Sequence, residues 1–347
     1  MIPEPSEVEI PSEVISAAIA GKLTIFIGNG LSRLYGYPSW SGLADAMLTA
    51  LAKDKDIPLT FNDVSLMQDL PLKTKISIAD SYFKSNWKLG AEKKIDLTYE
   101  HILKKYQNSE KLKEGQIFAH LAKCRVKFIT TNYDDLLDSQ LNKLHQKSLD
   151  GQSLEIAEDE KNSDAELEKK NDFEIISYPH DLNFSAAAKQ TVLLHLHGIM
   201  GKGEGKLIAS TADYLKLYTD REFRESFLKF LEGQTLVFIG YGLEELEVLE
   251  MLFRASQLDG SDKKHIILLP LMSHKLYLLE HLKKYWGELG FQVKAYNTDK
   301  RGYDSIEDLI LKWAPEIAKE AKPPMPTKNN EVIDSILSKF DEVFNES

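Results

Sequence analysis

The chain has 347 residues, of which 43% are hydrophobic and 28% are charged, with 19 glycines and 12 prolines. This composition is typical of a globular protein and excludes collagen-like, low-complexity and wholly disordered chains. The formal net charge of -11 argues against a general nucleic-acid coat, because such proteins bind by neutralising phosphates. We therefore expect no direct nucleic-acid partner.

The single cysteine, Cys124, excludes an intrachain disulfide and a structural zinc site built from several thiolates. The N-terminal segment is acidic and interrupted by prolines, so it does not resemble a secretion signal. The most apolar stretch, residues 235–243, is far shorter than the ~18 residues that a membrane-spanning helix requires. We expect a cytoplasmic protein without a membrane partner.

Apolar runs of strand length recur along the chain and alternate with helical patterns. Alternation of this kind predicts an α/β fold, with a parallel sheet and helices on both of its faces. Residues 43–121 instead show helical periodicity and little strand signal, which predicts a helical insert or subdomain. The predicted strands cover residues 22–27, 126–130, 174–178, 192–196, 236–239, 265–269 and 291–296.

Two segments lie outside this alternating pattern. Residues 150–172 are predicted to form an acidic loop, since residues 155–170 carry seven acidic residues against three lysines. A solvated loop is the simplest interpretation, and a partner contact is the alternative. Residues 322–347 contain a proline-rich linker followed by an apolar stripe at helical spacing. We expect this amphipathic helix to dock on its own domain, to seat an oligomer or to bind another chain.

A glycine turn follows the first predicted strand. It contains Gly28, Asn29, Gly30 and Ser32. Glycines at such a turn let the backbone pass close to a phosphate, while a following helix supplies N–H donors. Alone, this G-x-G is more often an ordinary turn, and Arg33 replaces the third glycine of the dinucleotide fingerprint.

Polar side chains follow the second predicted strand, residues 126–130. Thr131, Asn132 and Asp134 stand there. Open α/β sheets bind ligands at the carboxyl ends of their strands, so this position predicts a binding site. The alternative is that these side chains only cap the next helix.

Two histidines lie at the end of the strand predicted over residues 192–196. The side-chain period of two in a strand predicts that His195 and His197 share one face. No third ligand is evident nearby in the sequence, so we predict no metal site.

Taken in order, these motifs resemble the SIR2, or sirtuin, superfamily. Residues 28–42 match the spacing of its pattern G-A-G-x-S-x-x-x-G-I-P-D-F, and Asn132 and Asp134 match its T-Q-N-x-D. His197 begins a match to its His-Gly, and residues 240–243 match its late glycine loop. The resemblance implies a Rossmann-like SIR2 fold, with residues 12–321 forming one NAD-binding domain.

Departures from the sirtuin pattern narrow what the resemblance implies. Sirtuin deacylases carry a zinc ribbon of paired cysteines after the His-Gly, and residues 198–218 contain no cysteine. Ser39 and Ser41 stand where the deacylases have an acidic and a basic residue. The remaining motifs resemble the SIR2-like NADase effectors of bacterial antiphage systems such as Thoeris and the defence-associated sirtuins. That branch implies hydrolysis of NAD+ to nicotinamide and ADP-ribose without a metal.

The resemblance also implies roles for individual residues. Asn132 would hold the ribose hydroxyls or the attacking water, and His197 would contact the ribose hydroxyls and act as a general base. Asp134 would offset the positive charge that develops on the ribose, with helix capping as the alternative. The residues implied in NAD binding are Gly28, Asn29, Gly30, Ser32, Trp40, Thr131, Gly240, Tyr241 and Gly242. Candidate walls of the nicotinamide pocket, for which core packing is the alternative, are Tyr35, Trp40 and Tyr133.

An unregulated NAD-consuming enzyme would harm its own cell, so the resemblance implies a latent state and a trigger, as in abortive infection. The expected partner is a sensor, nucleotide-binding or ATPase subunit, or a second copy of the chain, docked through residues 322–347. Two other interpretations stay open. One is a non-catalytic module that binds NAD or ADP-ribose, and the other is a protein deacylase or ADP-ribosyltransferase.

Overall fold

The computed structural model describes residues 1–53, 59–85, 116–149, 173–183, 191–200, 207–242, 245–259 and 265–321. Within these residues, seven strands form one sheet in which every neighbouring pair is parallel. The strands are β1 (Leu23–Ile27), β2 (Lys127–Thr130), β3 (Phe173–Ile176), β4 (Thr191–His195), β5 (Thr235–Ile239), β6 (His265–Leu271) and β7 (Phe291–Asn297). Each strand predicted from the sequence is present, and the predicted parallel α/β fold is confirmed.

The order of the strands creates a crevice beside β1. The sheet order is β3-β4-β2-β1-β5-β6-β7, so β1 lies between β2 and β5. From β1 the chain builds β2, the edge strand β3 and then β4 between them on one side, and it returns to build β5, β6 and β7 on the other. This reversal is a topological switch point, and ligands of open parallel sheets bind at the carboxyl ends of the strands near such a point.

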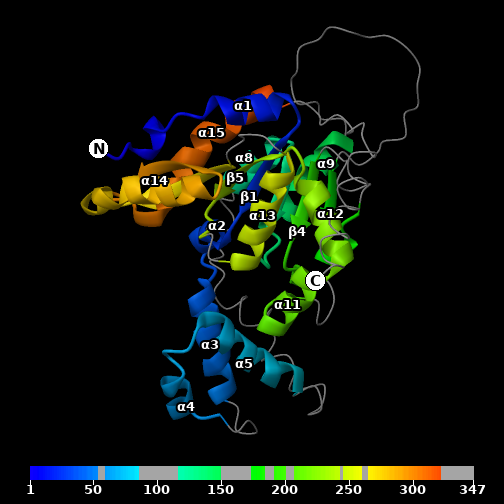
Figure 1. Cartoon of the computed structure of the whole chain (residues 1–347), viewed down its shortest axis with the longest axis vertical. Helices are drawn as coiled ribbons and strands as arrows, with labels where there is room; N and C mark the ends of the chain where they lie inside the picture. The colour runs from blue at the N-terminus through cyan, green and yellow to red at the C-terminus, as the bar shows by residue number, and fades with distance from the viewer. Residues whose placement is uncertain are drawn as a thin grey trace, which may run out of the picture.

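Helices cover both faces of the sheet because neighbouring strand residues point to opposite faces. In β1, Ile25 and Ile27 belong to one hydrophobic cluster and Phe26 belongs to another. The first face carries α1 (Ser12–Ile19), α8 (Gln116–Lys123), α9 (Leu136–Leu149) and α15 (Ile306–Glu320). The second carries α11 (Thr211–Thr219), α12 (Arg221–Leu231) and α13 (Leu246–Asp259), while α14 (Leu279–Glu288) packs on β7 (Figure 1).

A group of helices extends from one end of this layered core (Figure 1). After the short α2 (Asn29–Leu34), it contains α3 (Trp40–Ala52), α4 (Phe61–Leu66) and α5 (Leu72–Ser85). Helix α3 begins where the Ser39 side chain accepts a hydrogen bond from the Gly42 N–H at 3.0 Å. The part of residues 43–121 that the structure describes contains helices and no strand. That this segment is a separate insert stays a proposal.

The remaining short elements are the 3-10 helices η1 (Pro5–Glu7), η4 (Pro179–Asp181), η5 (Ser273–Leu278) and η6 (Gly302–Ser305). The predicted acidic loop, residues 150–172, and the predicted C-terminal helix, residues 322–347, lie outside the described residues. In the described ranges, no helix combines the length and the apolar content needed to cross a membrane.

Candidate functional site

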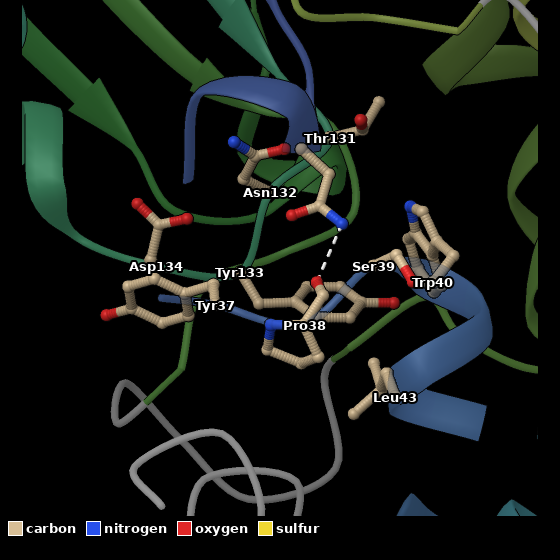
Figure 2. Close-up of a pocket in the computed structure, with 10 residues that line it drawn as sticks. Tyr37, Pro38, Ser39, Trp40, Leu43, Thr131, Asn132, Tyr133 and Asp134 are labelled. Atoms are coloured by element: carbon tan, nitrogen blue, oxygen red, sulfur yellow. Dashed lines mark hydrogen bonds between the residues drawn. The ribbon is translucent and has the colours of Figure 1, made fainter. Parts of the chain in front are cut away.

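A pocket lies at the carboxyl ends of β1 and β2, where residues 29–43 meet residues 131–134 (Figure 2). Its first wall contains the beginning of α3, and its second is the loop between β2 and α9. Five of the predicted site residues line it, namely Asn29, Trp40, Thr131, Asn132 and Asp134. The sequence did not single out four further lining residues for binding, namely Tyr37, Pro38, Ser39 and Leu43.

The amide of Asn132 is held in one orientation. Its Nδ2 group donates to the Gly28 carbonyl at 3.1 Å and to the Ser32 hydroxyl at 2.7 Å. Both N–H donors are therefore used, and among the described residues its buried Oδ1 atom has no hydrogen-bond partner. An unpaired buried acceptor costs free energy, so this oxygen is a ready acceptor for a hydroxyl or a water that enters the pocket.

Ser32 joins Asn132 to Asp134. Its hydroxyl accepts from Asn132 and donates to the Asp134 carboxylate at 2.6 Å. Burial raises the pKa of Asp134, and the hydrogen bonds from Ser32 and from the Leu136 N–H oppose this rise. The Leu136 bond, at 3.2 Å, lies at the first residue of α9. Asp134 thus lines the pocket and also stabilises the start of a helix, which was the alternative role considered for it.

We expect Ser32→Ala to destabilise the fold by about 1–3 kcal/mol, because it leaves a buried carboxylate and a buried amide without their shared partner. Urea unfolding measures this change. The matched control is Ser41→Ala, at an exposed position of α3, for which a change within about 0.5 kcal/mol is expected. Equal stability of the two variants would contradict the role given to the Ser32 hydroxyl.

The first glycine turn packs directly against the late glycine loop. The Gly28 N–H donates to the Ile239 carbonyl at 2.9 Å, and the Gly30 N–H donates to the Gly240 carbonyl at 2.7 Å. A Cβ atom on Gly28 would lie 2.4 Å from the Tyr241 Cα. We call the contact of Gly28 and Gly30 with Gly240 the glycine junction. Since these two N–H groups are already paired, the predicted pyrophosphate contact of these glycines remains a prediction.

The rest of the late glycine loop is split between surface and interior. Gly242 is exposed, whereas the Tyr241 ring packs against Phe26 with centroids 4.6 Å apart. The Tyr241 hydroxyl donates to Glu245 at 2.5 Å. Tyr241 therefore contributes to the interior below the loop, and its predicted contact with NAD is not tested by this geometry.

Two of the three predicted aromatic walls lie at the pocket. The rings of Trp40 and Tyr133 meet edge to face with centroids 5.4 Å apart, and the Tyr133 hydroxyl donates to the Ile208 carbonyl at 2.7 Å. Tyr35 lies elsewhere, in the hydrophobic core beside Phe118. Core packing, the alternative considered for these aromatics, therefore describes Tyr35.

The prediction that His195 and His197 share one face is wrong. β4 ends at His195, so the alternation of a strand does not extend to His197. His195 Nε2 lies 2.9 Å from Asp138 Oδ2 on α9, while His197 Nδ1 lies 3.3 Å from the Tyr214 hydroxyl on α11. These two helices cover opposite faces of the sheet.

His197 is fully buried and neutral. Both of its ring nitrogens contact tyrosine hydroxyls, with Nε2 3.1 Å from Tyr218 and Nδ1 3.3 Å from Tyr214. Burial and the nearby positive charge of Lys73 lower the pKa of His197 to about 3. His197 is absent from the residues that line the pocket. This environment favours hydrogen bonding over proton abstraction, and its role as general base remains a prediction.

Glu245 is a buried carboxyl group that the sequence analysis missed. It accepts hydrogen bonds from the hydroxyls of Tyr241 and Tyr214, the latter at 3.0 Å. Burial raises its pKa to about 7. No sequence signal separates Glu245 from the other acidic residues, because Tyr214 comes from a different segment of the chain and the spacing to Tyr241, four residues away, is not distinctive.

No group of three or more His, Cys, Asp or Glu side chains is arranged to hold a metal ion in the described part of the chain. The groups that line the pocket include a fixed amide, a buried carboxyl group and aromatic walls. These groups can orient a sugar and stabilise a developing positive charge.

Comparison with protein families finds a match for one segment of the chain. A family model described as a SIR2-like domain matches residues 126–293. This segment of the chain is similar to SIR2-like domains. The matched segment includes Asn132, Asp134, His197 and the late glycine loop, but not the first glycine turn. The SIR2 resemblance of the sequence and its fold are thereby confirmed.

Two curated relatives align with nearly the whole chain. The chain is 26% identical over 353 residues to "Defense-associated sirtuin 2" of Bacillus subtilis, an alignment that covers 97% of this chain and 29% of that protein. It is 23% identical over 337 residues to "NAD(+) hydrolase ThsA" of Cytobacillus dafuensis, which covers 94% of this chain and 55% of that protein. The chain therefore spans less than two thirds of either relative.

Proposed function

We propose that this SIR2-like chain is an NAD+ glycohydrolase that cleaves NAD+ to nicotinamide and ADP-ribose. The observation that carries the proposal is the buried, unpaired Oδ1 of Asn132 in a pocket at the carboxyl ends of the parallel strands. The SIR2-like domain and the name of the NAD(+) hydrolase relative support it.

The proposed reaction breaks the bond between the nicotinamide nitrogen and the ribose. The bonding electron pair moves to the nicotinamide nitrogen and neutralises its positive charge, while positive charge develops on the ribose. A water molecule then bonds to the ribose carbon and loses a proton to solvent or to a nearby base. The protein's main tasks are to orient the ribose and to stabilise the developing cation.

In the proposal, Asn132 orients the ribose or the attacking water, and Asp134 stabilises the developing cation. Asn132 Oδ1 accepts a hydrogen bond from a ribose hydroxyl or from the attacking water, an interaction that its fixed orientation makes available without rearrangement. An ionised Asp134 stabilises the cation by charge. Trp40 and Tyr133 offer the nicotinamide ring an apolar wall.

We further propose that the activity depletes NAD+ as an antiphage effector and stays latent until a partner or self-assembly triggers it. The name of the defense-associated relative supports this role. Residues 322–347 are the proposed docking element for a sensor subunit or for a second copy. The NAD-depleting role predicts a cytoplasmic protein.

Product analysis tests the proposal. The purified chain is incubated with NAD+, and nicotinamide, ADP-ribose and cyclic ADP-ribose are separated by chromatography while calorimetry measures NAD+ binding. We expect nicotinamide and ADP-ribose in equal amounts. Binding without nicotinamide release would indicate the latent state or the non-catalytic NAD-binding module, and repeating the assay at chain concentrations that drive self-assembly would separate the two. Neither binding nor release, at micromolar concentrations of the chain, would overturn the assignment of NAD+ as ligand.

A further inference from the structure

We propose that Glu245 is a positioning residue that selects the tautomer of His197 through the hydroxyl group of Tyr214. The inference rests on the hydrogen-bond geometry of three side chains from separate parts of the chain, namely the segment after β4, α11 and the segment before α13. The pH dependence of activity that follows from this inference rests on the proposed NAD+ cleavage. The assignment of the His197 tautomer does not depend on that activity.

The direction of each hydrogen bond follows from the ionised carboxylate. A carboxylate can only accept, so the Tyr214 hydroxyl donates its proton to Glu245 Oε1 at 3.0 Å. The Tyr214 oxygen is then an acceptor toward His197 Nδ1 at 3.3 Å, which requires a proton on Nδ1. Glu245 Oε1 itself lies 3.8 Å from Nδ1 and favours the same proton position by charge.

The Nδ1–H tautomer leaves Nε2 as an acceptor. The Tyr218 hydroxyl lies 3.1 Å from Nε2 and donates to it in this arrangement. When Glu245 is protonated, its own hydroxyl can donate to the Tyr214 oxygen instead. Tyr214 can then donate to Nδ1, and His197 carries its proton on Nε2. The charge of one buried carboxyl group thus decides which nitrogen of His197 can accept a hydrogen bond.

Of the titratable side chains in this cluster, Glu245 is the one whose pKa lies near neutral pH. Burial raises the pKa of Glu245 to about 7, whereas burial lowers the pKa of His197 to about 3 and raises those of the neighbouring tyrosines well above 10. Lys73 of α5 forms an ion pair with Glu247 of α13 at 2.6 Å and lies 4.1 Å from the Tyr214 ring centroid. The titratable and charged groups that face Glu245 are Lys73, His197, Tyr133, Tyr214, Tyr218, Tyr241 and Glu247.

The catalytic consequence is a rise in activity with pH. Above pH 7, Glu245 is ionised and His197 Nε2 is an acceptor. A ribose hydroxyl can use this acceptor only where substrate binding displaces Tyr218, because His197 does not line the pocket of the unliganded chain. Below pH 7, Nε2 carries the proton and this interaction is lost. At pH 6 about one tenth of Glu245 is ionised, so kcat should fall about tenfold from its high-pH value.

Nitrogen-15 NMR of the histidine side chains tests the structural part directly. The His197 signals are assigned by their loss in His197→Ala, and the tautomer is followed from pH 5.5 to 8.5. We expect the Nδ1–H form at high pH and a switch toward Nε2–H near pH 7. Glu245→Gln should remove the switch, while Glu247→Gln, which alters an acid outside the hydrogen-bonded chain, should retain it.

Two results would overturn the proposal. One is a His197 proton on Nε2 throughout the pH range, and the other is an unchanged switch in Glu245→Gln. Tyr214→Phe provides an independent variant, because it leaves Glu245 in place but removes the connecting hydroxyl. The switch should be lost in this variant too.

The pH profile of nicotinamide release tests the catalytic part. The wild type and Glu247→Gln should show the tenfold fall at pH 6, and Glu245→Gln and Tyr214→Phe should show nearly flat profiles between pH 6 and 8. A full tenfold fall in Glu245→Gln would contradict the positioning role. Absence of release at every pH would instead contradict NADase activity of the isolated chain, while the NMR result would still decide the tautomer assignment.

Discussion

Asn132→Ala is expected to lower the rate of nicotinamide release from NAD+ by about a hundredfold or more. The substitution removes the buried oxygen that the two hydrogen bonds to Gly28 and Ser32 hold in place. Loss of one oriented hydrogen-bonding group that acts in the transition state costs about 10²–10³ in rate. The release of nicotinamide is measured under single-turnover conditions, so that product dissociation does not mask the chemical step.

Two further variants separate chemistry from folding. Asn132→Asp keeps an oxygen at this position but loses the two N–H donors, so its carboxylate faces the Gly28 carbonyl. We expect it to be as inactive as the alanine variant. Asn183→Ala, at an exposed turn after η4, is the matched control and should retain wild-type activity. Activity of Asn132→Ala within about threefold of wild type would exclude a role for Asn132 in the chemical step.

Gly28→Ala is expected to destabilise the fold by about 3 kcal/mol or more. The added Cβ would lie 2.4 Å from the Tyr241 Cα and 2.5 Å from the Gly240 carbonyl oxygen, so it would collide with backbone atoms. No side-chain rotation relieves such a contact, and the strands β1 and β5 would have to separate at their carboxyl ends. Thermal and urea unfolding measure the loss.

The matched control for this prediction is Gly287→Ala. Gly287 lies in α14, and a Cβ there would meet no atom of the described residues within 4 Å. Alanine is the better helix former by about 1 kcal/mol, so this variant should be as stable as wild type or more stable. If both alanine variants unfold at the wild-type midpoint, the close approach at the glycine junction is not a feature of the folded protein in solution.

The sheet and half of the pocket could be predicted from the sequence because both depend on local patterns. The central strands β1 and β5 are short apolar runs, and burial in a parallel sheet requires such runs. Asn132 and Asp134 directly follow a strand, and the carboxyl end of a strand is where open sheets bind ligands. Residues that directly follow a strand in the chain lie at its carboxyl end, so the location of Asn132 and Asp134 could be predicted.

The rest of the site depends on contacts between distant segments, which a single sequence does not encode. The prediction for His195 and His197 failed because periodicity does not tell where a strand ends. Glu245 was missed because its partner Tyr214, from a separate segment, is brought to it only by folding. The glycines of the first turn suggested a phosphate site, yet Gly28 is also required by the backbone of the late glycine loop.

The structure of the chain with bound ADP-ribose tests the account most directly. We predict that the ribose freed from nicotinamide lies in the pocket, with one hydroxyl within hydrogen-bond distance of Asn132 Oδ1 and the sugar facing Trp40 and Tyr133. ADP-ribose is the product, so this complex forms without turnover. A ribose bound outside the pocket, with Asn132 Oδ1 still unpaired, would contradict the assignment of this pocket as the site of NAD+ cleavage.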